Sequence, residues 1–317
     1  EAHFAKASFS VVVLDEAQAI KNPRSTTAHA ASALRATFKV ALTGTPFENN
    51  LLELWSLFHF TLPELLGEEK TFGKLFRRPI ETHGDAEARE ALRRRIFPFL
   101  LRRTKEVVAK DLPEKTVTVS RVELSPNQRD VYETVRATMS ARVAEALATK
   151  GLKKAHILIL DALLKLRQAA CDPRLLRMNA AKRAPSAKLE HLGDMLAELV
   201  SEGRRVLVFS QFVTMLDNIA HELDSRKLRY TVLTGQTENR RDVVRGFQEG
   251  DAPIFLLSLK AGGTGLNLTA ADVVIHYDPW WNPAAESQAT DRAHRVGQDK
   301  PVFVYKLIGK ETIEEQI

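Results

Sequence analysis

Short apolar runs rich in β-branched residues alternate with helical patterns over much of the chain. Residues 9–14 and 39–43 are two such runs, and the Ala-rich stretch 25–36 between them has helical character. A strand, a helix and a second strand in this order predict two parallel strands of one sheet.

The last third of the chain shows the same alternation more regularly. The strand candidates there are 205–210, 230–233, 254–258, 272–277 and 302–308. The helical patterns between them lie near 212–225, 239–249 and 284–296. This order predicts a complete doubly wound α/β domain with a parallel sheet.

The middle of the chain has a helical pattern. Residues 51–110 are also basic, with arginine clusters at 77–78, 93–95 and 102–103. Ser125 and Pro126 predict the start of another helix, because serine caps helices and proline is tolerated in the first turn. Its apolar positions recur every four residues and predict one buried stripe, made of Val131, Val135, Met139 and Val143. The stretch 179–186 lacks apolar periodicity and is predicted to be a linker.

Length and composition are compatible with these elements. The 317 residues are enough for two domains, and 44% hydrophobic with 27% charged residues is typical of globular proteins. The net charge of +6 fits a polyanionic partner without identifying one. No apolar run approaches the roughly 20 residues of a membrane span. The single cysteine, Cys171, excludes an internal disulfide, and we expect it to be a buried small apolar residue in a reducing compartment.

Two carboxylates follow the first predicted strand. Asp15 and Glu16 come directly after the apolar residues 11–14 and precede Ala17 and Gln18. In phosphoryl transfer an aspartate at a strand end commonly holds Mg²⁺, and a neighbouring carboxylate can orient and deprotonate the attacking water. A bare Asp-Glu pair is more often a solvated acidic turn, so the catalytic interpretation depends on partners elsewhere in the chain.

The second predicted strand ends in Leu-Thr-Gly-Thr-Pro, residues 42–46. The hydroxyl groups of Thr43 and Thr45 could bond both a carboxylate and a phosphate-sensing network, and a plain Gly-Pro turn is the alternative. The distance from Asp15 matches one strand–helix–strand unit of about 30 residues. Both strand ends are therefore expected at the same edge of the sheet, where binding sites of such sheets lie.

A glycine-rich loop, residues 258–267, follows the strand candidate 254–258. Its three glycines permit close approach of a ligand to the backbone and expose amide groups to an anion. A flexible connector would need neither Thr264 nor Asn267 beside the glycines, which favours a binding loop.

Arg292 and Arg295 are predicted to lie on a helix that starts near Pro283. Their i, i+3 spacing would place them on one helix face. Arginine offers a planar fork that is always charged, and an arginine finger accelerates phosphoryl transfer about 10³–10⁵-fold. A surface helix with ion pairs to Asp291 or Glu286 is the alternative.

Two tryptophans, Trp280 and Trp281, precede this helix. Paired tryptophans usually belong to a core, but beside an Asn-Pro turn one of them could stack on a base or pack against a sugar.

Together these segments resemble the Swi/Snf-type branch of the superfamily-2 helicases. The matching segments, in the family's order, are 15–23 (DEAQAIKNP), 42–50 (LTGTPFENN), 166–173 (LRQAACDP), 208–212 (VFSQF), 258–267 and 291–298 (DRAHRVGQ). The last of these, together with 277–283 (YDPWWNP), is highly specific, and the resemblance covers nearly the whole chain.

The resemblance implies an α/β protein with two RecA-like parallel-sheet lobes that close on ATP, with helical insertions between them. Such a motor moves on double-stranded DNA and remodels bound proteins rather than separating strands. The implied domains are 1–64 for the C-terminal part of the first lobe, 65–118 for its helical protrusion, 119–184 for a helical insertion and linker, and 185–317 for the second lobe.

The resemblance also implies roles for single residues at the nucleotide. Asp15 would ligate Mg²⁺ through water, Glu16 would be the general base, and Gln18 would link the nucleotide to the other lobe. The further residues expected at the nucleotide are Gly265, Gln298 and the two arginine fingers, Arg292 and Arg295.

A second set of residues would contact DNA or couple hydrolysis to it. These are Thr43, Thr45, Ser210, Gln211, Gly263, Thr264 and Trp281. The expected partners are double-stranded DNA and DNA-bound proteins such as RNA polymerase or other nucleoid complexes, in the bacterial cytoplasm. Gln18 is similar to bacterial members, which makes nucleosomes a doubtful substrate.

The family's phosphate loop, Gly-x-Gly-Lys-Thr, does not occur in these 317 residues. The chain begins with Glu1 rather than Met, so we expect a fragment whose loop and adenine-binding segment lie upstream. Without that loop the triphosphate lacks its main cradle. We therefore expect little ATP hydrolysis by this polypeptide, and ATP hydrolase activity with Mg²⁺ in the intact protein.

The sequence leaves three alternatives. Another superfamily-2 motor, such as an RNA helicase or restriction translocase, is disfavoured by Trp-Trp-Asn-Pro and the long helical insertion. A DNA-binding or scaffold module without catalysis is disfavoured by the intact Asp15, Glu16, Arg292 and Arg295, although the absent phosphate loop keeps it open. A metal hydrolase built on Asp15 and Glu16 lacks a histidine or third carboxylate at ligand spacing.

Overall fold

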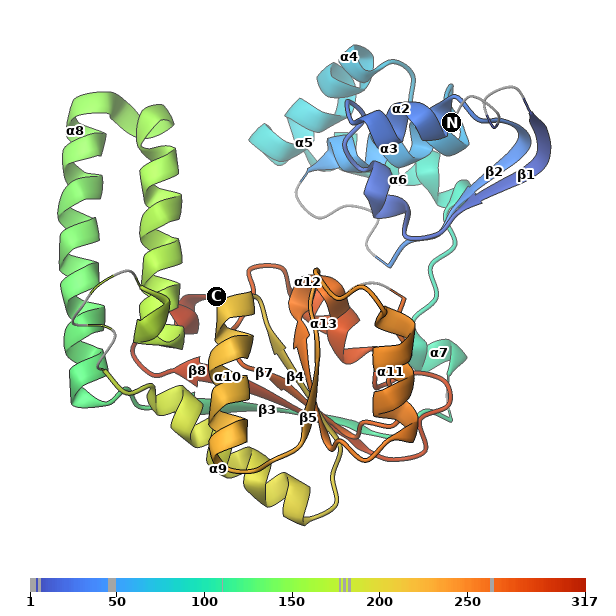
Figure 1. Ribbon diagram of the computed structural model, residues 1–317. Coiled ribbons are helices and arrows are strands. Elements are labelled where there is room, and N and C mark those ends of the chain that lie inside the picture. Colours follow the sequence, from blue (N-terminus) through green and yellow to red (C-terminus); the bar gives the residue numbers. More distant parts are fainter. Residues whose placement is uncertain are drawn as a thin grey trace. The chain divides into compact units, whose positions relative to one another are not determined.

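In the computed structural model the chain forms two compact units, Glu1–Val108 and Ala109–Ile317 (Figure 1). The described residues are 4, 7–44, 50–109, 111–176, 178, 181, 184–262 and 265–317, without the side chains of 106, 150, 153 and 154. No helix in this described part is both long and apolar enough to span a membrane.

The first unit contains the predicted strand–helix–strand element. Strands β1 (Ser8–Leu14) and β2 (Arg35–Ala41) are parallel, and α2 (Thr26–Ser32) lies between them in sequence. Ser25 caps α2 by accepting a hydrogen bond from the N–H of Ala28 at 3.1 Å. The prediction of two parallel strands is confirmed.

Only one face of this two-stranded sheet is packed among the described residues. Val12 and Leu14 lie against a core that includes Leu57 and Phe60 of α3 (Leu51–Thr61). On the other face the side chains are between 40% and 66% exposed, and they are Val11, Val13, Phe38 and Val40. The register pairs Val11 with Phe38 and Val13 with Val40, so these four form one apolar patch.

Short helices complete the first unit, as the basic helical pattern predicts. They are α3, α4 (Glu69–Phe72), the π-helical turn η2 (Gly73–Arg77), α5 (Arg78–His83), α6 (Ala86–Ile96), the 3₁₀ turn η3 (Phe97–Phe99) and α7 (Lys105–Val108). Their core contains Trp55, Phe72, Phe76 and Leu92. The carboxylate of Asp85 caps α6 by accepting from the N–H groups of Glu87 and Ala88.

The second unit is built on a six-stranded parallel sheet. Its order is β3 (Lys115–Val122), β8 (Val302–Gly309), β7 (Val273–His276), β4 (Val206–Ser210), β6 (Ile254–Ser258) and β5 (Tyr230–Leu233). Five of these strands match the predicted ones. The sixth, β3, was not predicted, because its valines alternate with polar residues and the surrounding pattern is helical.

Helices cover both faces of this sheet (Figure 1). One face packs against α9 (Ala187–Ser201) and α10 (Val213–Ser225). The other packs against α11 (Arg240–Glu249), α12 (Leu259–Gly262) and α13 (Pro283–Thr290). The doubly wound α/β domain is thereby confirmed.

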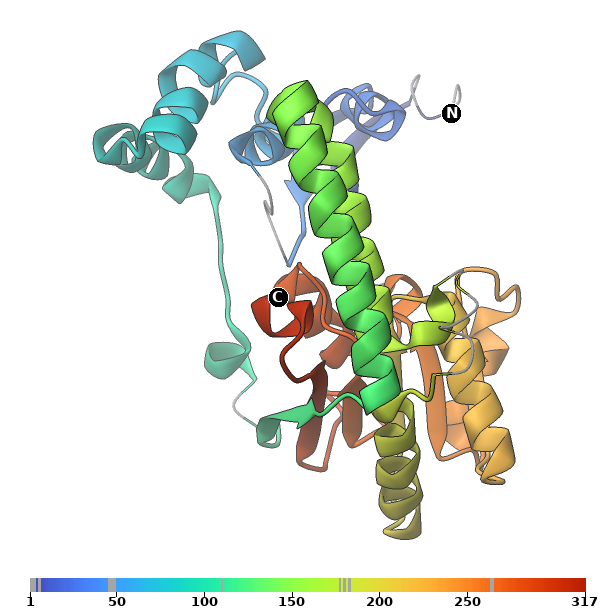
Figure 2. The same ribbon diagram turned by 90° about the vertical axis from the view of Figure 1, so that its left-hand side faces the viewer.

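A long helical hairpin, α8 (Pro126–Cys171), joins β3 to the rest of this unit (Figure 2). Gly151 interrupts it with φ 70° and ψ 169°, a left-handed backbone that favours glycine, and the two arms lie side by side. The predicted stripe of Val131, Val135 and Met139 is buried against alanines of the second arm.

The sequence predicts a helix cap before this hairpin and a linker after it, and the structure confirms only the cap. Ser125 caps α8, as predicted, by accepting from the N–H of Gln128 at 3.3 Å. The predicted linker 179–186 lies partly outside the described residues. Of its described members, Ala181, Ala184 and Ser186 are buried and Pro185 is exposed, so most of this part is packed against the domain.

Candidate nucleotide and nucleic-acid sites

The chain leaves β1 through a tight turn that carries both predicted carboxylates. Glu16 has φ 50° and ψ 48°, a left-handed conformation that is uncommon for residues other than glycine. Its N–H donates to Oδ1 of Asp15 at 2.9 Å. The N–H of Ala17 donates to the carbonyl of Leu42 at 2.9 Å, which fixes the turn to the end of β2. The surrounding structure thus holds the two carboxylates in a conformation that a free acidic turn would rarely adopt.

Gln18 joins the carboxylate turn, residues 15–18, to the end of the second strand. Its Nε2 donates to Oε2 of Glu16 at 2.6 Å, and its Oε1 accepts from the hydroxyl of Thr43 at 2.8 Å. The structure therefore brings Glu16, Gln18 and Thr43 together at one edge of the sheet, as the spacing predicts. Thr45, the other predicted hydroxyl, lies outside the described residues.

The carboxylate turn has the donor atoms that Mg²⁺ prefers. Asp15 is exposed and offers carboxylate oxygens, whereas Glu16 is half-buried and oriented by Gln18. Across the described residues no group of three His, Cys, Asp or Glu side chains could enclose a metal ion. A site with one or two carboxylates suits Mg²⁺ that keeps water and phosphate ligands, and it does not support a metal hydrolase.

The two predicted arginine fingers do not lie on a helix face, so this expectation is wrong. Helix α13 ends at Thr290. Beyond it the N–H groups of Arg292 and Ala293 bond to carbonyls three residues earlier, which replaces the helix by turns. Ala293 is fully buried in the core below the sheet, and Leu268 donates its N–H to the carbonyl of Arg292 at 2.9 Å. Packing against the core and against the segment that follows the glycine-rich loop thus overrides the helical pattern.

In this arginine turn, residues 291–298, the two guanidinium groups have different surroundings. Arg292 is buried, whereas Arg295 is exposed and its Nη1 lies 3.4 Å from the carbonyl of Leu266. Leu266 belongs to the glycine-rich loop, and Leu268, which follows this loop, makes the backbone contact with Arg292.

Gln298 ties the arginine turn to the segment after the glycine-rich loop. Its Nε2 donates to the carbonyls of Thr269, Ala271 and Ala293 at 3.1, 2.8 and 3.1 Å. Its Oε1 accepts from the N–H groups of residues 299 and 300. The side chain therefore supports the backbone here, and its contact with a nucleotide stays a prediction.

The glycine-rich loop begins tightly against the sheet. A Cβ atom at Gly262 would lie 2.4 Å from the ring of Phe209, so only glycine fits this approach. Gly265 has φ 47° and is exposed. Gly263 and Thr264 lie outside the described residues, and their expected DNA contacts stay predictions.

Ser210 and Gln211, at the end of β4, are bound to a carboxylate that sequence reasoning did not identify. The hydroxyl of Ser210 donates to Oδ1 of Asp278 at 2.5 Å, and the N–H of Gln211 lies 3.3 Å from both carboxylate oxygens. Asp278 is buried, and burial raises its pKa to about 6 against the opposing hydrogen bond from Ser210.

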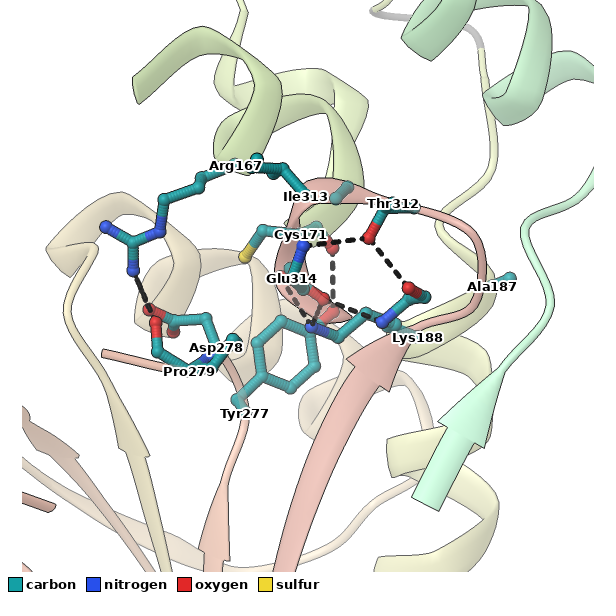
Figure 3. A network of polar contacts seen from close by, with 12 residues as sticks. Arg167, Cys171, Ala187, Lys188, Tyr277, Asp278, Pro279, Thr312, Ile313 and Glu314 are labelled. Atoms are coloured by element: carbon teal, nitrogen blue, oxygen red, sulfur yellow. Dashed lines mark hydrogen bonds and ion pairs between the residues drawn. The ribbon is translucent and has the colours of Figure 1, made fainter. Parts of the chain in front are cut away.

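Arg167 of α8 is the second residue that sequence reasoning missed. Its guanidinium reaches Gln211 and Pro279, and Figure 3 shows it facing Asp278 and Pro279 from the helical hairpin. It lies four residues before the buried Cys171 in a helix, so a charge at a core-facing position was the available signal. Trp281, the predicted DNA contact, is 46% exposed nearby.

Figure 3 also shows a buried ion pair at the C-terminal end of the chain. Nζ of Lys188 lies 2.9 and 3.0 Å from the carboxylate oxygens of Glu314, with side chains 0% and 1% exposed. The same ammonium lies 5.0 Å from the ring centre of Tyr277, whose hydroxyl donates to the carbonyl of Cys171. Helix α9, the residue that follows strand β7 and the 3₁₀ turn η6 (Ile313–Gln316) are joined at this point.

Comparison with known proteins gives two family matches. The SNF2-related domain matches residues 1–175, and the helicase conserved C-terminal domain matches residues 187–297. A putative ATP-dependent helicase/translocase of Bacillus subtilis, YwqA, is 39% identical over 98% of this chain and 34% of its own length. An uncharacterized ATP-dependent helicase of Mycoplasma genitalium, MG018, is 41% identical over 98% of this chain and 29% of its own length.

Among solved structures, the SWI2/SNF2 ATPase core of Sulfolobus solfataricus in complex with double-stranded DNA is similar to the whole chain. It is 36% identical with a TM-score of 0.55, and it covers 100% of this chain and 67% of its own. The chain spans only 29% to 34% of the length of these two curated relatives.

Proposed function

Because this chain belongs to the Swi/Snf-type family of ATP-dependent helicases, we propose that the protein couples ATP hydrolysis to movement along double-stranded DNA. Displacement or remodelling of DNA-bound proteins would follow from that movement. The similar Bacillus subtilis protein bears the name helicase/translocase, and the similar Sulfolobus core was solved with duplex DNA.

The observation that carries the proposal is the hydrogen-bond chain from Thr43 through Gln18 to Glu16. In it the amide of Gln18 holds the half-buried carboxylate of Glu16 at the end of β1 and also accepts a hydrogen bond from the hydroxyl of Thr43 at the end of β2. Glu16 would take the proton from the attacking water, and Asp15 would hold Mg²⁺ through water. The bound Mg²⁺ would neutralise phosphate charge. A change at Thr43 would reach Glu16 through Gln18, which is a route for coupling hydrolysis to DNA.

In the second unit the arginine turn would supply positive charge to the triphosphate. Arg292 and Arg295 would have unequal roles, because one is buried and the other exposed. Gly265 would lie near the nucleotide, and we propose that Gln298 acts by holding the turn in shape. Ser210, Gln211 and Trp281, with Gly263, Thr264 and Thr45, would contact the duplex or respond to it.

DNA-stimulated ATPase of the complete protein tests this function. Glu16→Gln should lower turnover about 10²–10⁴-fold while preserving the hydrogen bond to Gln18, because general-base catalysis contributes about that factor. Glu87→Gln, an exposed residue of α6, is the matched control and should leave turnover unchanged. Equal turnover of Glu16→Gln and the wild type would show that another group is the base.

A further inference from the structure

Arg167 is a buried charge at the junction of the helical hairpin α8 and the second sheet. The residue is only 3% exposed, and its nearest carboxylate oxygen, Oδ2 of Asp278, lies 4.0 Å from Nη2. Burying a guanidinium costs free energy unless its surroundings compensate. A protein that needed only to attach this helix could use an apolar side chain, so the contacts of the guanidinium call for an explanation.

The polar contacts of Arg167 reach two strand ends at once. Its Nη1 donates to Oε1 of Gln211 at 3.0 Å, and its Nη2 donates to the carbonyl of Pro279 at 2.5 Å. Gln211 follows β4, and Pro279 follows the neighbouring strand β7. Asp278 already links the same two strand ends through Ser210. Arg167 therefore adds the helical hairpin as a third element to this junction.

Three aromatic rings surround the guanidinium. Its central carbon lies 5.2 Å from the ring centre of Trp280, 5.5 Å from that of Trp281 and 5.8 Å from that of Phe212. A planar guanidinium can stack its face on rings while the donors of its rigid fork bond two separate acceptors, whereas a lysine ammonium has neither the planar face nor the fork. Trp281 keeps 46% of its surface exposed, so one ring of this cluster is held in place and still open to a ligand.

Gln211 is held through its amide oxygen alone. Its Nε2 is buried and has no hydrogen-bond partner among the described residues. Since Arg167 binds the oxygen, it also decides which way the amide donor points.

We propose that Arg167 is a positioning residue that sets the orientation of Trp281 and Gln211 for duplex DNA and couples it to the helical hairpin α8. This rests on the proposed DNA function of these two residues. Arg167 does not touch DNA in this proposal. It acts through the carbonyl of Pro279, the amide of Gln211 and the stacked rings.

A double-mutant cycle on duplex affinity tests this role with the whole chain. Fluorescence anisotropy of a labelled duplex gives Kd for the wild type, Arg167→Lys, Trp281→Ala and the double variant. Trp281→Ala should weaken binding about tenfold, because the packing of this ring against the sugars and backbone of the duplex would be lost. Arg167→Lys should weaken binding by a similar factor in the wild type and by a clearly smaller factor in the Trp281→Ala background, where only the contribution through Gln211 is left to lose.

Arg136→Lys is the matched control, because Arg136 lies on the same helix with a 58% exposed side chain paired to Glu133. It should leave Kd unchanged. Denaturant midpoints of all variants are measured in parallel. A purely structural Arg167 would lower the midpoint and give effects on Kd that multiply with those of Trp281→Ala, which would overturn the proposal. So would an Arg167→Lys variant that binds as tightly as the wild type.

If Arg167→Lys does not fold, Gln211→Ala removes one acceptor of the guanidinium, and the same lack of additivity with Trp281→Ala is expected. Multiplying effects there would again overturn the proposal. If the wild-type chain itself does not bind duplex DNA, the DNA function fails, and the inference about Arg167 fails with it rather than on its own account.

Discussion

Asp278 and His276 are buried two residues apart at the end of β7, and burial moves their pKa values in opposite directions. Burial raises the pKa of Asp278 from its ordinary 3.8 to about 6, and the nearby charge of Glu314 acts in the same direction. The Ser210 hydrogen bond, Lys188 and Arg167 oppose this rise. Burial lowers the pKa of His276 from 6.5 to about 4, while Glu286 opposes and Lys306 reinforces the change.

The two groups therefore have opposite effects on stability between about pH 4 and 6. The folded state binds a proton at Asp278 before the unfolded state does, so this group destabilises the fold as pH rises from 4 to 6. At His276 the unfolded state binds the proton first, so stability is lost as pH falls from 6.5 to 4. Each shift is worth roughly 3 kcal/mol, and in the wild type they nearly cancel.

Asp278→Asn should reveal the pH dependence of stability that His276 contributes. Asparagine keeps the acceptor for Ser210 but does not titrate. The variant therefore lacks the increase in the free energy of unfolding that Asp278 contributes as the pH falls. Relative to the wild type, its free energy of unfolding should fall by roughly 3 kcal/mol between pH 7 and pH 4. Urea unfolding at several pH values measures this difference. Asp242→Asn, at a 66% exposed side chain of α11, is the control. A difference for Asp278→Asn that does not change with pH would contradict the raised pKa.

At the scale of elements, the sheet of the second unit could be predicted because its central strands are continuous apolar runs. Strands β4, β6 and β7 are buried along their whole length, as expected for a parallel sheet covered on both faces. Strand β3 has the weaker signal of an edge strand. Its partner β8 begins at Val302, so no local pattern could reveal the pairing.

The candidate sites divide in the same way. The meeting of the two strand ends at one edge of the sheet follows from strand order alone and was predicted, whereas the bridge that Gln18 makes between Glu16 and Thr43 was not. The end of α13 at Thr290 was not predicted, because it depends on how Ala293 packs against the sheet. The contacts of Arg167 involve residues more than forty positions away, which a helical pattern cannot show.

In the first unit, replacing phenylalanine by alanine should have unequal effects on stability at a buried and at an exposed position. Phe60 is fully buried, and Phe60→Ala should lower the free energy of unfolding by about 3–5 kcal/mol. Phe38 is 66% exposed on the exposed apolar face of the sheet formed by β1 and β2, and Phe38→Ala should lower the free energy of unfolding by less than about 1 kcal/mol. Urea unfolding followed by the fluorescence of Trp55, in a background where Trp280 and Trp281 are replaced by Phe, measures both in the first unit. A large cost at Phe38 would mean that this apolar face is covered in solution.

At the scale of the whole molecule, positive charge is concentrated in one segment. Residues 70–105 contain eleven Lys and Arg but only four Asp and Glu, whereas the whole chain has a net charge of +6. Several of these arginines lie on the surface, with side chains of Arg77, Arg93 and Arg94 exposed by 40%, 65% and 78%. This segment is therefore expected to supply phosphate contacts to a duplex.

Salt titration of duplex binding tests this expectation. A contact between a side chain and one phosphate contributes about 0.9 to the slope of log K against log salt. Arg94→Gln should weaken binding and reduce the slope by about one unit, irrespective of DNA sequence. Arg229→Gln, at a 70% exposed arginine of the second unit, should leave the slope unchanged. An unchanged slope for Arg94→Gln would place the phosphate contacts elsewhere.

The ion pair between Lys188 and Glu314 makes the last few residues part of the domain interior. Ile313 also donates its N–H to the hydroxyl of Tyr132 at 2.8 Å, and Arg129 binds the carbonyls of residues 310 and 311. Truncation after Gly309 would strand an ammonium in a dry environment beside Tyr277 and remove the docking points of the helical hairpin. The core of the second unit is therefore complete only when η6 is in place, and any shortened or tagged version should keep residues 310–317 intact.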